Sequence, residues 1–144
     1  MLFRSIEVAV SLDHVTFLSM IHEPEWARSA LGSPIPLFAT LPLARMKGLR
    51  PIVLLGGVHG DEPEGVWLAK ATIEMLRQEP QHVRVPWVIV PCLNVDGFSR
   101  GTRVNGRGVD LNRNYPSRNW SPTHDKDRYF PGPSPGSEDR KSTV

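Results

Sequence analysis

The stretch Ile52-Val53-Leu54-Leu55-Gly56-Gly57-Val58-His59-Gly60-Asp61-Glu62-Pro63 joins a short apolar run to the start of a helix. The continuous apolar run over 52–55 predicts a strand buried on both faces, as in a parallel or mixed sheet, and two glycines end it. Asp61 and Glu62 beside Pro63 are typical of a helix N-terminus, because acidic groups favour the positive end of the helix dipole and proline fits the first turn. The stretch therefore predicts a strand followed directly by a helix.

The residues after Pro63 extend this pattern to a strand, helix, strand unit. Helical spacing up to about Gln78 places four apolar residues on one face, which are Val66, Ala69, Ile73 and Leu76. Glu79-Pro80 ends the helix, and the apolar residues over 85–93 predict a second buried strand. Units of this kind build α/β sheets, so we expect a mixed, mainly parallel sheet with flanking helices.

Short strands are expected before this unit and loops after it. Alternating apolar residues over 5–21 indicate strands, and the turn residues over 27–35 indicate the tip of a hairpin that leads into 37–40. Periodicity disappears after Asn94, and the segment 117–137 is rich in Ser, Pro, Asp and Gly. That composition predicts an extended loop.

The composition indicates one globular domain of 144 residues, with 40% hydrophobic and 22% charged residues. Its basic character comes mainly from arginine, and the segment 100–113 holds four of these residues, Arg100, Arg103, Arg107 and Arg113, opposed there only by Asp110. Such a cluster suits an anionic ligand. No aromatic interleaving or Cys/His finger accompanies it, so a nucleic-acid partner is not expected.

The single cysteine gives no sign of an oxidising compartment. Cys92 lies in an apolar stretch, where a small buried hydrophobic residue is the usual explanation, and one cysteine cannot form an internal disulfide. Neither a leader-length apolar run nor a membrane-spanning segment is present in the sequence. We therefore expect a cytoplasmic location and no membrane partner.

His59 and Glu62 stand three residues apart, directly after the first predicted strand. They supply two of the three residues of a His2Glu set, a known ligand set of catalytic zinc in which the fourth coordination position stays open. The arginine-rich segment follows the second predicted strand, and ligands of open α/β sheets bind beyond the carboxyl ends of the strands. The pair thus predicts a zinc site beside an anion-binding loop, while a simple helix cap remains the alternative explanation.

A longer motif points to a family. It reads Gly101-Thr102-Arg103-Val104-Asn105-Gly106-Arg107-Gly108-Val109-Asp110-Leu111-Asn112-Arg113-Asn114-Tyr115-Pro116. Together with His59 and Glu62 in the same order, it resembles the zinc carboxypeptidase superfamily (M14-type metallocarboxypeptidases), and within it the bacterial murein peptide amidase branch. The resemblance runs from about residue 27 to residue 138, and a match of this length is far more specific than a short pattern.

The resemblance implies a role for each matching residue. His59 and Glu62 match the first two ligands of one zinc ion, and Asp110 matches an aspartate that orients the ligating histidine. The implied reaction is hydrolysis of a peptide amide bond, in which zinc polarises the carbonyl and activates a water.

The implied substrate is a small peptide with a free carboxylate. Asn112 and Arg113 match the pair that grips this carboxylate, and Arg103 matches the arginine that stabilises the oxyanion. The murein branch implies a cell-wall tripeptide, cut between γ-D-glutamate and diaminopimelate. A relative of aspartoacylase and succinylglutamate desuccinylase is an alternative, since those enzymes share the His-x-x-Glu pattern and an Asn-Arg pair.

The carboxyl-terminal end departs from the family pattern. In the family a third zinc ligand, a histidine, and a catalytic glutamate follow at positions that would fall beyond Val144. We therefore expect residues 1–144 to be the amino-terminal portion of a single, truncated catalytic domain, with 117–144 mostly loop and an aberrant end. His124 lies in the predicted loop and is not expected to replace the missing histidine. One alternative is therefore a non-catalytic remnant that binds zinc or carboxylates weakly. We also expect self-association through an uncovered sheet edge.

Overall fold

The computed structural model describes residues 20–80 and 84–138. Its elements are, in chain order, β1 (Ile21–Arg28), β2 (Pro34–Ala39), the 3-10 turn η2 (Leu43–Met46), β3 (Ile52–Leu55), α1 (Pro63–Gln78), β4 (Trp87–Val90), α2 (Val95–Arg100) and the 3-10 turns η4 (Leu111–Arg113) and η5 (Asp127–Tyr129). The strands expected over 5–21 lie outside the described residues except for Met20 and Ile21, the second of which begins β1.

The four strands form one mixed sheet in the order β1-β2-β4-β3. β1 and β2 make an antiparallel hairpin in which Arg28 pairs with Pro34, which confirms the hairpin tip predicted over 27–35. β2 is also antiparallel to β4, whereas β3 runs parallel to β4. The α/β class and the mixed sheet are thus confirmed. The described part has one parallel and two antiparallel pairings, so the expected predominance of parallel pairing is not found there, because the β1–β2 hairpin adds its strands to the sheet in the antiparallel sense.

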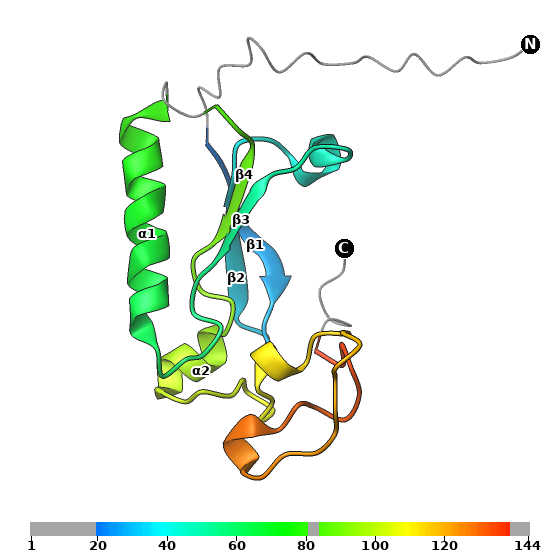
Figure 1. Ribbon diagram of the computed structural model, residues 1–144. Coiled ribbons are helices and arrows are strands. Elements are labelled where there is room, and N and C mark those ends of the chain that lie inside the picture. Colours follow the sequence, from blue (N-terminus) through cyan, green and yellow to red (C-terminus); the bar gives the residue numbers. More distant parts are fainter. Residues whose placement is uncertain (1–19, 81–83, 139–144) are drawn as a thin grey trace, which may run out of the picture.

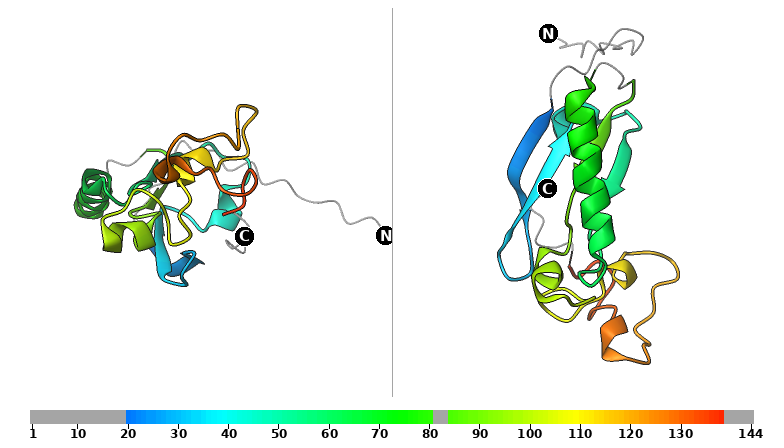
Figure 2. Two further views of the ribbon diagram at one scale, coloured as in Figure 1. Left: turned by 90° about the horizontal axis from the view of Figure 1, so that it is seen from below. Right: turned by 90° about the vertical axis from the view of Figure 1, so that its left-hand side faces the viewer.

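Helix α1 lies along one face of the sheet (Figures 1 and 2). Its buried residues are Val66, Ala69 and Ile73, with Leu76 partly buried, so the predicted face and the predicted end at Gln78 are both confirmed. Trp87 and Ile89 of β4 point to this helix, and Val88 and Val90 point to the opposite face. Every residue of β4 is therefore buried, as predicted for the second strand, but this strand spans only 87–90 of the predicted 85–93, and Val85 is 45% exposed.

The prediction that β3 is buried on both faces is wrong. Ile52 is 61% exposed and Val53 is 57% exposed, because β3 lies at one edge of the described sheet and pairs only with β4 there. The main-chain N-H of Ile52 donates to Pro86 and that of Gly56 to Val90, so the alternate groups of Val53 and Leu55 point away from β4. Beside this edge lies a largely apolar cleft of about 690 Å³, lined among others by Ile52, Val53, Met75 and Val85.

Helix α2 (95–100) lies where the sequence predicted only loops after the second strand. Asn94 caps it by accepting a hydrogen bond from the N-H of Gly97 at 2.9 Å, and Gly101 ends it in the left-handed conformation with φ of 63°. None of the helices in residues 20–80 and 84–138 has the length and apolar character needed to cross a bilayer.

Candidate metal and carboxylate site

The site begins where β3 and β4 end. Main-chain hydrogen bonds continue past the strands, from Leu93 N-H to Gly56 O and from Asn94 N-H to Gly57 O, both at 2.9 Å. The loop after β3 and the segment before α2 are therefore held side by side at the carboxyl end of the parallel pair. Figure 1 shows this end of the sheet beside α2 and the loops that follow it.

The turn that carries His59 packs directly on α2. A Cβ atom added at Gly60 would lie 2.0 Å from the carbonyl carbon of Gly97 and 2.3 Å from the nitrogen of Phe98. Only glycine allows the two main chains to approach so closely. The position of His59 is thus set by a main-chain contact and not by its own side chain alone.

His59 and Glu62 face one another across this turn. Nδ1 of His59 is 3.1 Å from Oε1 of Glu62, and the two side chains are 11% and 61% exposed. They line an open cleft of about 450 Å³ together with Leu55 and Glu64. The described residues contain no group of three His, Cys, Asp or Glu side chains that could hold a metal ion. The structure thus brings the predicted pair together and adds no third ligand to it from residues 20–80 and 84–138.

Asp110 lies on the other side of the histidine ring. Its side chain is fully buried, and Oδ1 is 3.3 Å from Nε2 of His59. A carboxylate can only accept, so the consistent assignment is that Nε2-H donates to Asp110. A neutral ring would then present a bare Nδ1 lone pair to the Glu62 carboxylate. Two acceptors 3.1 Å apart suit a cation between them, either a proton or a metal ion.

Asp110 is also the centre of the arginine-rich segment. Oδ2 accepts from Nε of Arg103 at 2.9 Å and lies 3.5 Å from Nε of Arg113. Oδ1 accepts from the N-H of Asn112 at 3.1 Å, which caps the turn η4. One buried carboxylate therefore fixes the main chain of η4 and the Nε atoms of two arginine side chains.

The cationic side chains differ in what their outer nitrogens contact. Nη1 of Arg103 is 3.4 Å from Oε1 of Glu62, so this arginine connects the predicted metal ligand with Asp110. Asn112 and Arg113 line a separate small cleft of about 180 Å³, and the Arg113 side chain is 49% exposed. All six residues predicted for the site thus lie at the same end of the molecule and are linked through Asp110.

Other candidates lie outside this arrangement. Arg100 is exposed, and Arg107 pairs with Glu138 at 3.6 Å. His124 is exposed, with Nδ1 3.1 Å from the carbonyl of Pro122 and its ring tilted against Phe130. His22 stacks on Phe38 in the hairpin. None of these residues contacts His59 or Glu62 in the structure.

Two residues of the site were missed by sequence reasoning. The ring of Tyr129 lies near the guanidinium groups of Arg103 and Arg113, and Nη2 of Arg128 is 3.2 Å from Oδ2 of Asp61. Both residues belong to η5, within a segment that has no periodic pattern. A tyrosine beside an arginine in such a loop gives no sign of its tertiary neighbours.

Cys92 is buried behind the site, and burial raises the pKa of its thiol from 9.0 to about 11 despite the opposing charge of Lys70. The neutral thiol is therefore the stable form. At pH 8 we expect maleimide to label Cys92 roughly a hundredfold more slowly in the folded than in the urea-unfolded protein. Because the folded pKa is the higher one, this group favours folding below pH 9 and loses that contribution as the pH rises through 11. Equal labelling rates in both states would contradict the assignment.

Comparison with known proteins identifies several relatives. A family model described as the succinylglutamate desuccinylase/aspartoacylase catalytic domain matches residues 49–131, more than half of the chain. Murein peptide amidase A of Escherichia coli K12 is 38% identical over 95 residues, which are 66% of this chain and 36% of that protein. The chain therefore spans little more than a third of the length of this curated relative.

Solved structures give the same picture. The crystal structure of a murein-tripeptide amidase from Escherichia coli O157 is similar with a TM-score of 0.56 and 30% identity, over 85% of this chain and 52% of that one. Carboxypeptidase A from Helicoverpa armigera is similar in fold, with a TM-score of 0.58 and 23% identity over 86% of this chain and 35% of that one. The described sheet and helices thus have the arrangement found in metallocarboxypeptidases and amidases.

Proposed function

This chain belongs to the succinylglutamate desuccinylase/aspartoacylase catalytic-domain family within the M14-type metallocarboxypeptidase superfamily, and we propose that its site serves zinc-dependent hydrolysis of an amide bond next to a free carboxylate. The observation that carries the proposal is the linked set of His59, Glu62 and Asp110 at the carboxyl end of the parallel strands. His59 and Glu62 would hold the ion, whose remaining ligands would be groups other than the residues that the structure describes.

The fit to zinc rests on the two acceptor atoms that face one another. Nδ1 of His59 and Oε1 of Glu62 are both ligand types that zinc accepts, and the bond from Nε2 to Asp110 holds the ring in the required orientation. When bound, zinc would polarise the scissile carbonyl and lower the pKa of a water. The helix cap alternative does not account for the pair, because α1 has no side-chain cap from Glu62.

The protein's own cations would bind and orient the peptide. Arg113, with Asn112 beside it, offers a planar fork to a carboxylate, while Nε is already directed at Asp110. Arg103 is 15% exposed and lies against Glu62, so its guanidinium is placed to stabilise negative charge developing on a carbonyl oxygen close to the ion. Asp110 would hold both arginine side chains and the histidine ring in fixed positions relative to one another.

For the substrate we propose the murein tripeptide, in which Asn112 and Arg113 would hold a carboxylate of diaminopimelate after the γ-D-glutamyl bond. The similarity to murein peptide amidase A supports this choice. The family match supports the second candidate, removal of an acyl group from an N-acyl amino acid. Both reactions place a carboxylate beside the scissile amide. The cytoplasmic location and the division of the chain at residue 117 remain predictions from the sequence.

Zinc binding tests the metal half of the proposal. Because only two ligands come from the described residues, we expect the 144-residue chain to bind zinc weakly, and His59→Ala or Glu62→Ala to lower the affinity by about tenfold or more in competition titrations at buffered free zinc. Imidazole added as an external ligand should strengthen binding to the wild-type chain. His22→Ala, which changes a histidine stacked on Phe38, is the matched control and should bind as wild type does.

The same titrations can contradict the proposal. Undiminished zinc affinity in both His59→Ala and Glu62→Ala would remove the pair from the metal site. If zinc binds only weakly, we expect no turnover by the 144-residue chain. That result would correspond to the non-catalytic alternative, in which the chain binds zinc and carboxylates but does not hydrolyse an amide. Stoichiometric zinc that survives dialysis, together with turnover, would show that the chain itself completes the site. In that event the rates on murein tripeptide and on N-acetyl amino acids would distinguish the two substrates.

We further propose that the 144-residue chain self-associates through the β3 edge. This edge exposes Ile52 and Val53 and leaves alternate main-chain groups directed away from β4. Sedimentation velocity should show an average mass that rises with concentration, and Val53→Lys should reduce it, because a charged side chain disfavours pairing at an edge. Leu31→Lys, which changes an apolar residue of similar exposure in the hairpin tip, is the control. A stable monomer at all concentrations would be incompatible with this surface.

A further inference from the structure

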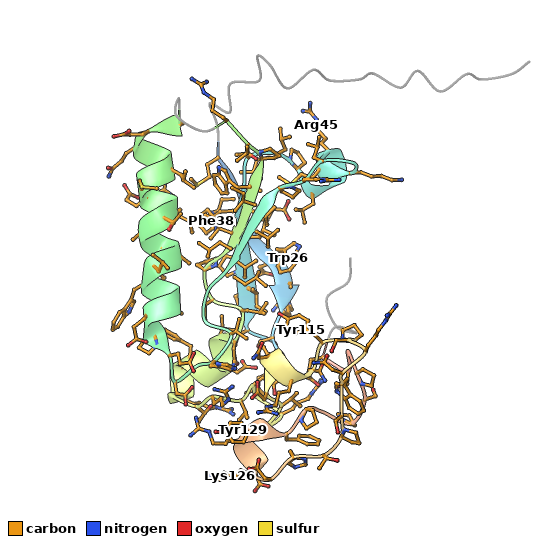
Figure 3. The ribbon with its side chains drawn as sticks, viewed as in Figure 1. Trp26, Phe38, Arg45, Tyr115, Lys126 and Tyr129 are labelled. Atoms are coloured by element: carbon orange, nitrogen blue, oxygen red, sulfur yellow. The ribbon has the colours of Figure 1, made fainter. Side chains whose placement is uncertain are left out.

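Tyr129 lies where three arginine side chains meet. The guanidinium carbon of Arg113 is 4.8 Å from the centre of the tyrosine ring, and those of Arg103 and Arg128 are each 5.4 Å away. Figure 3 shows Tyr129 at the end of the molecule opposite Arg45, within the loops below the sheet. Two of these three arginines are the ones assigned above to the carboxylate and the oxyanion.

The ring has a physical reason to lie there. The face of an aromatic ring attracts a cation within about 6 Å of its centre, and all three distances fall within that limit. Guanidinium groups that share one small region also repel one another. An aromatic ring close to each of them stabilises these charges, without occupying the hydrogen-bonding nitrogens as a carboxylate would.

The main chain fixes the ring relative to the site. The carbonyl of Phe130, the next residue, accepts a hydrogen bond from the N-H of Asp110 at 2.8 Å. On the preceding side, Arg128 pairs with Asp61 in the turn that carries His59 and Glu62. The position of Tyr129 is therefore tied both to the buried carboxylate and to the proposed metal turn.

Arg113 is the residue that most needs this support. Its side chain is 49% exposed, and its one ion pair with a described residue joins Nε to Asp110 at 3.5 Å. An ion pair at Nε leaves the outer nitrogens available to a ligand, but it does not by itself select one rotamer of a long, half-exposed side chain. Contact with the ring restricts the rotation that Asp110 leaves open.

We propose that Tyr129 is a positioning residue, whose ring holds the guanidinium of Arg113 in the orientation that binds the substrate carboxylate. This inference rests on the proposed function, since it gives Tyr129 a part in carboxylate recognition. It makes the ring, and not the hydroxyl, the active feature. Phenylalanine at position 129 should therefore position Arg113 as tyrosine does, whereas a large aliphatic residue should not.

The first test needs neither zinc nor a substrate. In the 144-residue chain, the Nε-H resonance of Arg113, assigned by its loss in Arg113→Lys, is expected to be displaced by the ring current. The displacement should persist in Tyr129→Phe and disappear in Tyr129→Leu, while the main-chain amide spectrum of residues in the sheet stays unchanged. A resonance at the same position in wild type and Tyr129→Leu would overturn the proposal.

The second test measures recognition. Titrating the murein tripeptide and its diaminopimelate carboxamide should show that Tyr129→Leu raises the Kd of the carboxylate form roughly three- to tenfold, the range expected for loss of a cation-π contact. Tyr129→Phe should match wild type, and the carboxamide should bind equally to all three proteins. Equal weakening by Phe and Leu would assign the effect to the hydroxyl and overturn the proposal. If wild type does not bind the tripeptide, the proposed substrate fails, while the resonance comparison still decides the role of Tyr129.

Discussion

Replacing Asp110 by alanine is expected to lower the free energy of unfolding by about 3–5 kcal/mol, the cost of removing one partner from a buried ion pair. The Asp110 side chain is fully buried, and Arg103, only 15% exposed, directs Nε at it from 2.9 Å. Alanine would leave this cation without its buried partner, and it would also remove the cap from η4. Urea unfolding followed by tryptophan fluorescence measures the change.

Two comparisons make this result specific to the network. Asp110→Asn keeps the shape and the acceptor for the N-H of Asn112 but removes the negative charge, so we expect a smaller loss than for alanine. Asp125→Ala changes an exposed aspartate of the following loop and should alter stability by less than about 0.5 kcal/mol. A loss below about 1 kcal/mol in Asp110→Ala would mean that Arg103 is well solvated without this partner.

Gly60→Ala is the second substitution expected to have a large effect, with a loss of about 3 kcal/mol in the free energy of unfolding. The added Cβ would lie 2.0 Å from the carbonyl carbon of Gly97 and 2.4 Å from its oxygen. These are main-chain atoms of α2, which cannot rotate away as a side chain would. The turn and the helix must therefore separate, which would also move His59 relative to Asp110.

Gly65→Ala is the matched control for this effect. It changes a glycine only five residues away, in the first turn of α1, where the new Cβ would meet only the nitrogen of Gly57 at 3.3 Å. Alanine also favours the helical conformation, so we expect a change within about 1 kcal/mol. If the two substitutions destabilise the protein equally, the contact between the turn and α2 is not what holds His59 in place.

The elements predicted best from the sequence were those that local chemistry determines. The limits of α1 follow from Pro63 at one end and Glu79-Pro80 at the other, and the apolar spacing between them sets its buried face. The hairpin follows likewise from its turn residues. The residues expected at the site lie together because they follow the carboxyl ends of neighbouring strands. Their roles stay predictions.

What the sequence did not reveal depends on neighbours distant in the chain. A run such as 52–55 is apolar whether or not another strand lies beside it. Its residues therefore could not show that β3 is at the edge of the sheet that the structure describes. Helix α2 has six residues and a glycine within it, too short to show a periodic pattern. Tyr129 meets Arg103 and Arg113 only through the folding of a loop without periodicity.

The two hydrogen bonds that continue the parallel ladder past β3 and β4 join main-chain atoms only. They hold the loop of His59 beside the segment that leads to Asn94, whatever side chains those loops carry. Evolution can therefore exchange the groups that grip a ligand, one substitution at a time, without having to rebuild the frame that spaces them. In a family whose relatives include amidases, carboxypeptidases and deacylases, such a frame separates the inheritance of geometry from the choice of substrate.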